Sequence, residues 1–581
     1  MPSQVTASSL DRPPAPRLPP PAPRAGLSGT RHHGIGSERG WTIAAVAGAA
    51  VLTMPVAAVL WLAAASGQDS IWPHLLSTVL PGSFATTLAL LLGTGLLTLI
   101  IGTAAAWLVT MFHFPGCTLA DRLLVLPLAM PAYIVAYAYV DLLDYAGPVQ
   151  SALRSMFDYA SARDYAFPEV RSLPGAIVIF SSVLYPYVYL TARASFVQQS
   201  VCVLEVARTL GETAWGAFRT VALPLARPAL AAGVALVAME CLNDLGAVQY
   251  LGVETLSASI AATWLQRANL AGAAQLASVM LALVAVLMII EHAARGLGGT
   301  QATTGRLRAI PFETLTGWRA ALTLAGVLLP FVLGFALPFA VLIIRALGHT
   351  ASADSASFVS AAKNSLILAA LASVFAVTLA MLFAYAARLQ PGPATRACVR
   401  AVSLGYALPG TVLAIGLLSP LATFDNTLDA WMRSTAGVST GLLLSGSLFA
   451  VTFALVIRFL AVAIGSVEAG LGRVSSNLDA AARTLGASPW STLTRVHLPI
   501  LAPALGAAAL LVFVDAMKEL PATLLLRPFN FETLATHVYA LTAAEQFEEA
   551  ALGAVTIVVI GLIPVLLLHS AIARGRTGGE T

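Results

Sequence analysis

The stretch "ARTLG" occupies positions 207–211 and occurs again, unchanged, at positions 482–486. Each copy is followed by a tryptophan four residues after its glycine and, later, by a Leu-Pro pair. Alignment of residues 205–240 with residues 480–515 needs no gap and makes 15 of 36 positions identical. The similarity extends upstream, where "MPAYIV" (130–135) matches "LPGTVL" (408–413). The chain therefore contains an internal duplication.

The composition places most of the chain in lipid. Of its 581 residues, 58% are hydrophobic and 10% are charged, whereas a soluble domain has about a quarter charged residues. Apolar runs long enough for a helix across a core of about 30 Å predict twelve spans, and all are free of internal charge except residues 224–250, which carry charge but are otherwise apolar. They lie at residues 39–69, 84–112, 122–141, 171–193, 224–250, 267–291, 319–345, 363–388, 400–425, 433–458, 495–515 and 549–574.

An even number of spans separates the two copies, so both have the same orientation in the membrane. We therefore predict an all-α integral membrane protein, with twelve transmembrane helices in two parallel six-helix repeats related by a pseudo-two-fold axis. The repeats cover residues 41–300 and 318–575, joined by a cytoplasmic linker at 301–317. Residues 1–40 are rich in Pro and Arg, which is typical of a disordered cytoplasmic tail, and residues 576–581 form a short second tail.

The distribution of basic residues orients the bundle. With both termini in the cytoplasm, the tails and inner loops carry 22 of the 32 Lys and Arg residues, as the positive-inside rule requires. The net charge of +4 then reflects membrane topology, and we expect no nucleic-acid partner.

The duplicated stretches lie in cytoplasmic loops, near residues 204–224 and 479–499. We expect Gly211 and Gly486 to end a first helix with a positive φ. Thr213 and Ser488 occupy N-cap positions for a second short helix. That helix is predicted to be amphipathic, to lie parallel to the membrane and to project an aromatic knob from one face. The pairs forming this knob are Trp215 with Phe218 and Trp490 with Leu493, and the next membrane helix restarts at Pro224 and Pro499.

Two explanations fit such a helix. It could lie among the lipid headgroups, or it could bind another protein. The duplication of one surface favours the second explanation, because two copies suit a two-fold symmetric partner.

These loops carry a resemblance to a known family. "EVARTLG…LPLARPAL" and "AAARTLG…LPILAPAL" resemble the EAA loop of ABC importer permeases. "YPYVYLTARASF" (185–196), "YLGVETLSASI" (250–260) and "MKELPATLLLRPFNFETLA" (517–535) are similar to the fused, two-halved permeases for ferric iron. The resemblance covers nearly everything after residue 40 and implies the type I (MetI-like) permease fold of an inner-membrane importer.

The resemblance also implies partners. Each loop would dock into a groove of a cytoplasmic ABC ATPase dimer, which would use ATP and Mg²⁺. An extracytoplasmic, periplasmic binding protein would deliver the cargo. One fused chain would serve as the whole permease, surrounded by membrane lipid. The coupling residues are then Glu205, Ala207, Gly211, Trp215, Phe218, Pro224, Asp479, Ala481, Gly486, Trp490, Leu493 and Pro499.

The two loops differ at the acidic position of the family motif. The first has Glu205, whereas the second has Ala480, with Asp479 one residue earlier. We therefore question whether both loops make the same charged contact with the ATPase.

The sequence offers no catalytic centre. Its two lysines follow no phosphate-binding glycine loop, and it contains no Gly-x-Ser-x-Gly or His-x-x-x-His pattern. We therefore predict no enzymatic activity, no bound cofactor and no metal site in this chain.

Four carboxylates lie in register after the two loops. Glu240 and Asp244 in the first half correspond to Asp515 and Glu519 in the second, and the i,i+4 spacing places each pair on one helix face. A charge at mid-membrane costs about 3 kcal/mol, so these groups should line a polar cavity, form pairs or lie near a membrane surface. Lys518 can neutralise Asp515, whereas the matching Asn243 cannot neutralise Glu240. The hypothesis is that Glu240, Asp244, Asp515, Lys518 and Glu519 line the translocation path between the halves. A structural or gating role and contact with a passing cation both remain open.

Three other functions remain possible from sequence. The fold would be the same if the cargo were thiamine, a phosphonate or another small solute. A secondary transporter with parallel six-helix halves would need no ATPase and would have little reason to keep two matching loops. The third alternative is a membrane scaffold that transports nothing.

Overall fold

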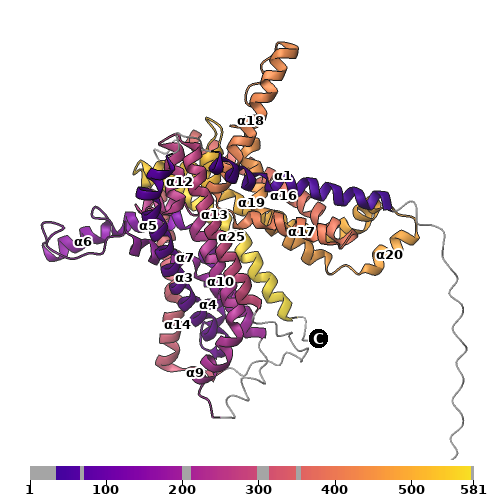
Figure 1. Ribbon diagram of the computed structural model, residues 1–581. Helices are drawn as coiled ribbons and strands as arrows, with labels where there is room; N and C mark the ends of the chain where they lie inside the picture. The colour runs from indigo at the N-terminus through magenta and orange to yellow at the C-terminus, as the bar shows by residue number, and fades with distance from the viewer. Residues whose placement is uncertain (1–34, 66–70, 199–210, 297–312, 349–354, 578–581) are drawn as a thin grey trace, which may run out of the picture.

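The computed structural model describes residues 35–65, 71–198, 211–296, 313–348 and 355–577, and it is almost entirely helical (Figure 1). The elements of the first half are α1 (Ile35–Ala64), α2 (Trp72–His74), η1 (Leu75–Val79), α3 (Leu80–Met111), β1 (Phe112–His113), α4 (Cys117–Leu123), η2 (Leu126–Ala129), α5 (Ala132–Leu143), α6 (Pro148–Phe157), α7 (Leu173–Gln198), α9 (Ala214–Ala217), η3 (Phe218–Ala222), α10 (Leu223–Asn243), α11 (Gly246–Tyr250), α12 (Leu256–Leu265) and α13 (Leu270–Gly296).

The second half repeats this order. Its elements are β2 (Glu313–Thr314), α14 (Gly317–Phe331), η4 (Val332–Ala336), α15 (Leu337–Gly348), α16 (Ser355–Leu389), α17 (Pro393–Ser403), η5 (Leu404–Ala407), α18 (Gly410–Ala436), α19 (Leu448–Leu471), α20 (Ser476–Thr484), α21 (Pro489–Thr492), η6 (Leu493–His497), α22 (Leu498–Met517), α23 (Pro521–Leu526), α24 (Leu534–Ala543) and α25 (Phe547–Thr577).

Within the described residues, eleven helices are long and apolar enough to cross a membrane, and a bent pair brings the total to twelve. The bent pair corrects the predicted third span. Its two parts, Cys117–Ala129 and Ala132–Phe157, meet at 95°. Pro131 explains the break, because the residue before a proline avoids the helical region, and Met130 is extended at φ −108° and ψ 117°.

The predicted ninth and tenth spans, 400–425 and 433–458, were also misplaced. The corresponding helices are α18 and α19, which lie 10 or more residues further along. Pro409 delays the start of α18. Asp425 stays inside this helix because its carboxylate accepts hydrogen bonds from the backbone N–H groups of Leu444 and Ser445 at 2.7–3.1 Å. A charged residue therefore did not mark the helix end.

The two halves exchange their first helices. Helix α1 packs against α16, α17 and α18 of the second half, while α14 packs against α3, α4 and α7 of the first. A hydrogen bond of 2.7 Å from Thr42 to Gln390 joins α1 to the segment after α16. In the other half, β1 pairs in parallel with β2 just before α14. The repeats are therefore interlocked, and neither is an independent bundle.

Small residues allow the central helices of the first half to approach closely. Gly102 on α3 and Gly233 on α10 both face α7. A methyl group at Gly102 would lie 2.8 Å from the backbone nitrogen of Tyr189, and one at Gly233 would lie 2.9 Å from the Cα of Val188. This packing by small residues is typical of helix pairs in membranes, and it fixes α10, which carries Glu240 and Asp244.

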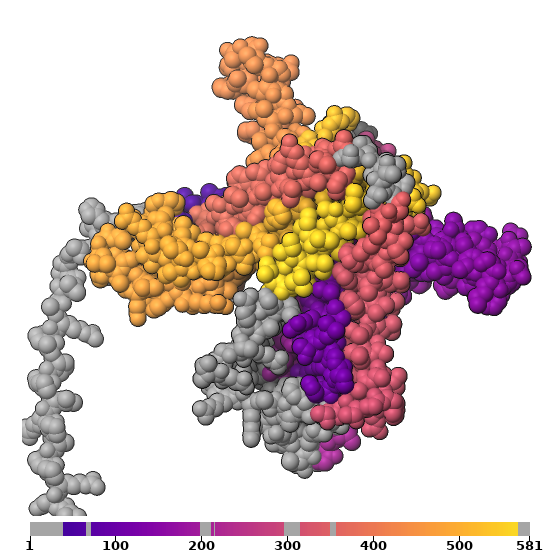
Figure 2. Space-filling model, turned by 180° about the vertical axis from the view of Figure 1, so that it is seen from behind, coloured from indigo at the N-terminus to yellow at the C-terminus, as the bar shows by residue number. Residues whose placement is uncertain are grey.

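The helices form two diverging bundles, and each bundle contains helices from both halves (Figure 1). Helix α9, within the first duplicated loop, and helix α20, which overlaps the second, lie at the far ends of the two bundles. Helix α6 and the end of α18 project from the opposite part of the molecule, and the view from behind shows both standing clear of the body (Figure 2). The arrangement thus has one end with two loop-bearing tips and another with two projecting helices.

Candidate functional site

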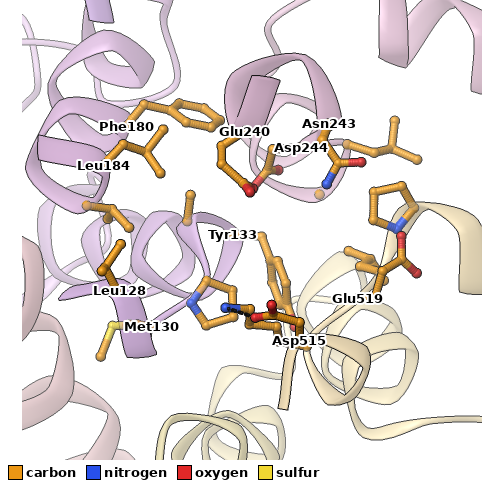
Figure 3. Close-up of a pocket in the computed structure, with 18 of the residues that line it drawn as sticks. Leu128, Met130, Tyr133, Phe180, Leu184, Glu240, Asn243, Asp244, Asp515 and Glu519 are labelled. Atoms are coloured by element: carbon orange, nitrogen blue, oxygen red, sulfur yellow. Dashed lines mark ion pairs between the residues drawn. The ribbon is translucent and has the colours of Figure 1, made fainter. Parts of the chain in front are cut away.

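A cavity of about 110 Å³ lies where the two halves meet. Helices α10 and α22 both end at its wall. Figure 3 shows Glu240, Asn243 and Asp244 of the first half across the cavity from Asp515 and Glu519 of the second. Its polar lining residues are Tyr133, Tyr187, Glu240, Asn243, Asp244, Tyr406, Arg458, Asp515, Lys518 and Glu519. The structure therefore brings together all five residues that the sequence analysis placed on the path: Glu240, Asp244, Asp515, Lys518 and Glu519.

In the second half each carboxylate has a basic partner. The Arg458 guanidinium lies 2.9 Å from Glu519, and their side chains are only 7% and 1% exposed. Lys518 Nζ lies 2.9 Å from Asp515 Oδ1. Glu519 also accepts hydrogen bonds from the N–H groups of Ala522 and Thr523 and from the Thr523 hydroxyl. Because these donors occupy both oxygens, Glu519 holds the start of α23 in place.

In the first half the carboxylates have only neutral donors. Glu240 accepts a hydrogen bond of 3.2 Å from the Tyr406 hydroxyl, and Asp244 accepts one of 2.7 Å from the N–H of Ala247. Over the part of the chain that the structure describes, no Lys, Arg or His side chain lies within ion-pair distance of either group. When all groups are ionised, four carboxylates therefore face two basic side chains, and the surplus negative charge lies on the first-half wall.

Sequence reasoning missed four of the polar groups that line this cavity: Tyr133, Tyr187, Tyr406 and Arg458. The three tyrosines had no signal of their own in the sequence. Arg458 did have one: it is an arginine inside the apolar helix α19, and an ionisable residue within a membrane span usually marks a functional or paired site. No group of three or more His, Cys, Asp or Glu side chains is placed to hold a metal ion among the described residues.

The duplicated loops confirm the predicted glycine geometry. Gly211 and Gly486 have φ values of 91° and 77°. The hydroxyl oxygen of Ser488 accepts a hydrogen bond from the N–H of Ser491, and that of Thr213 accepts one from Gly216. Both residues therefore cap the following helix as expected.

The predicted second helix of each loop is not a separate amphipathic helix. Residues Trp215–Asn243 and Pro489–Met517 each form one continuous span. The π turns η3 and η6 precede Pro224 and Pro499, and the wider π turn accommodates the proline, which lacks an N–H group. What we predicted to lie parallel to the membrane is instead the first turn of a membrane helix.

The aromatic knob is smaller than predicted. Trp215 and Trp490 are 64% and 63% exposed, whereas Phe218 and Leu493 are buried. Phe218 stacks on Trp215 with ring centroids 5.2 Å apart, as the i,i+3 spacing predicts, but it also packs on Trp107 with centroids 4.8 Å apart, and this contact buries it. Each loop therefore presents one exposed tryptophan. The structure also places Trp490 against Trp41 of α1, with ring centroids 6.1 Å apart.

The acidic residue of the second loop has an internal role. Asp479 lies 2.8 Å from Arg388 and 2.7 Å from His497, and Arg388 also donates hydrogen bonds to the carbonyls of Leu471 and Val474. These contacts attach α20 to the ends of α16 and α19. Ala481 is exposed on α20, while Glu205 and Ala207 lie outside the described residues.

Known proteins provide an independent comparison. A family described as "Binding-protein-dependent transport system inner membrane component" matches residues 98–294 and 376–577. The Fe(3+)-transport system permease protein FbpB 2 of Haemophilus influenzae is 26% identical over 472 residues, covering 81% of this chain and 85% of that protein. The sulfate transport system permease protein CysT of Escherichia coli is 28% identical over 35% of this chain and 69% of its own length. The putative 2-aminoethylphosphonate transport system permease protein PhnV of Salmonella choleraesuis is 29% identical over 45% of this chain and 96% of its own.

Proposed function

This chain belongs to the family of binding-protein-dependent transport system inner membrane components, and from that premise we propose that it is the whole permease of an ABC importer for ferric iron. As a member of this family it is a multi-pass permease subunit of the inner membrane and not an enzyme. The family implies two partners, an ATPase and a substrate-binding protein.

The ATPase is proposed to be a cytoplasmic dimer that binds ATP and Mg²⁺ and docks on the two loops. The exposed Trp215 and Trp490 support this proposal, because each lies in the first turn of a helix that runs to the cavity. Movement of either loop would therefore reach the cavity wall through α10 or α22. The binding protein would dock on the opposite side, near α6 and the end of α18.

The charge of the groups that line the cavity indicates which class of cargo it can pass. Four carboxylates and two basic groups line it, so an oxyanion such as sulfate would meet a net repulsion and a cation a net attraction. The relative named for Fe(3+) transport also covers most of this chain, whereas the relatives named for sulfate and 2-aminoethylphosphonate cover less than half of it. Both observations favour a cation.

Glu240→Gln and Asp244→Asn should each slow iron uptake about tenfold, which corresponds to about 1.4 kcal/mol of barrier. The reason is that each change removes one of the unneutralised charges that attract a cation into the cavity. Iron uptake would be measured in proteoliposomes that contain the protein and its ATPase, in the presence of iron-loaded binding protein. Glu254→Gln, at an exposed position away from the cavity, is the matched control.

Three outcomes would contradict this proposal. If both cavity variants took up iron at the wild-type rate, the carboxylates would not lie on the translocation path. Uptake of sulfate, a phosphonate or thiamine in place of iron would establish the alternative cargo within the same family. Uptake that follows an ion gradient and ignores ATP would instead indicate a secondary transporter.

We further propose that both termini and both duplicated loops are cytoplasmic. Single cysteines at Ser488, Ser155 and Ser434, in a variant lacking the native cysteines, test this topology. An impermeant thiol reagent added outside should label positions 155 and 434, which are exposed on α6 and α18, and should leave position 488 unlabelled. Asp425, the last residue of the predicted ninth span, is unsuitable as a labelling site because its side chain is fully buried. Labelling of position 488 from outside would refute the topology.

A further inference from the structure

The cavity wall differs between the halves at one pair of equivalent positions. Lys518 in the second half places its ammonium group 2.9 Å from Asp515. The residue 275 positions earlier is Asn243, whose amide oxygen accepts a hydrogen bond of 2.9 Å from the N–H of Gly410. Glu240 therefore occupies the place of Asp515 without a tethered cation beside it.

The second carboxylates, Asp244 and Glu519, differ in the same way, because the one in the first half has fewer hydrogen-bond donors around it. Both oxygens of Glu519 have donors, including Arg458 and the Thr523 hydroxyl. At the same 275-residue offset, the first half has Val183 for Arg458 and Val248 for Thr523, and neither valine can donate a hydrogen bond. Asp244 consequently uses one oxygen to cap α11 through the Ala247 N–H, and its other oxygen is available to the cavity.

A third oxygen belongs to the wall of the same cavity. The Tyr133 side chain is buried, with only 3% exposed, and its hydroxyl has no hydrogen-bond partner among the described residues. The side chain lines the same cavity and lies between the carboxylates of the two halves in Figure 3. A buried hydroxyl without a partner is unfavourable, so a ligand or water at this point would stabilise it.

We propose that Glu240, Asp244 and Tyr133 form a cation-binding site on the first-half wall, at the place equivalent to the Lys518 ammonium in the second half. Carboxylate and phenol oxygens are hard ligands, which suit a small multivalent cation. Two carboxylates and a phenol are too few to trap such an ion, so the site holds it briefly. This inference rests on the proposed function only in identifying the transported cation as the ligand in the cell.

Terbium(III) is a suitable probe, because it is a hard trivalent cation and its emission is sensitised by a nearby tyrosine. The experiment uses the full chain in nanodiscs, without ATPase or binding protein. Glu240→Gln and Asp244→Asn should each weaken the Tyr-sensitised binding about tenfold, and Tyr133→Phe should lower the emission at saturation. Glu254→Gln should bind terbium as the wild type does.

A pair of exchange variants tests the comparison between the halves. Asn243→Lys supplies the first half with its own tethered ammonium and should abolish the sensitised binding. Lys518→Asn removes the tethered cation from the second half and should add a second binding event. Because Asn243 also holds the Gly410 N–H, a normal elution profile in gel filtration is required for its variant.

The proposal is overturned if terbium binding is unchanged in both Glu240→Gln and Asp244→Asn. It is also overturned if a folded Asn243→Lys variant binds terbium like the wild type. These results differ from a failure of the proposed function. If the variants lose terbium binding but the protein imports no iron, the cation site stands and the proposed cargo is wrong. If the protein imports iron but the variants bind terbium like the wild type, the proposed cargo stands and the cation site is wrong.

Discussion

Arg458→Met should destabilise the protein by about 3–5 kcal/mol, the usual cost of leaving one charge of a buried ion pair without its partner. The Arg458 and Glu519 side chains are nearly inaccessible, so water cannot replace the guanidinium. Methionine preserves most of the volume, and the effect is therefore one of charge and not of a cavity. Thermal unfolding in detergent, followed by tryptophan fluorescence, would measure it.

A double variant separates the ion pair from the packing. Arg458→Met combined with Glu519→Gln leaves no uncompensated charge, and the glutamine oxygen can still accept the N–H group of Ala522. The double variant should therefore recover most of the lost stability. If the single variant were as stable as the wild type, the Arg458–Glu519 pair would not hold α19 to the start of α23.

Trp215→Ala should weaken ATPase binding by at least about 2 kcal/mol, or about thirtyfold, while membrane insertion stays normal. An exposed tryptophan at the tip of a bundle has the character of an interface anchor. Gly211→Pro should have at least as large an effect, because proline cannot adopt the φ of 91° found at this position. Co-purification of the ATPase with each variant measures the binding. Trp318→Ala, which alters an equally exposed tryptophan on α14, is the matched control.

The acidic residues of the two loops should behave differently. Glu205→Ala should reduce ATPase binding more than Asp479→Ala does. Asp479→Ala should instead lower the thermal stability, because it removes the partner of Arg388 and His497. Equal, undiminished ATPase binding and transport in the Trp215, Gly211 and Glu205 variants would refute the docking proposal.

Much of the fold followed from the sequence because its causes are local. Apolar runs predicted the positions of most membrane helices, since the length of a span is set by the thickness of the bilayer. The repeat predicted two equivalent halves, and the glycines of the duplicated loops have the positive φ values that their helix-ending role requires. Errors occurred where a distant contact overrode the local rule. Asp425 remained inside α18 because a returning loop supplied its hydrogen bonds, and Phe218 was buried by Trp107.

The sequence by itself determined the class of this protein, its duplication and the four carboxylates that lie in register, because each of these depends only on residue type and spacing. Only the tertiary structure decided which charges neutralise each other. Arg458 and Glu519 are 61 residues apart, and Tyr406 reaches Glu240 across 166 residues, so no spacing rule could pair them. The interlocking of the two halves brings these groups to one cavity, and the difference in charge between its walls arises because the second half carries two bases where the first has asparagine and valine.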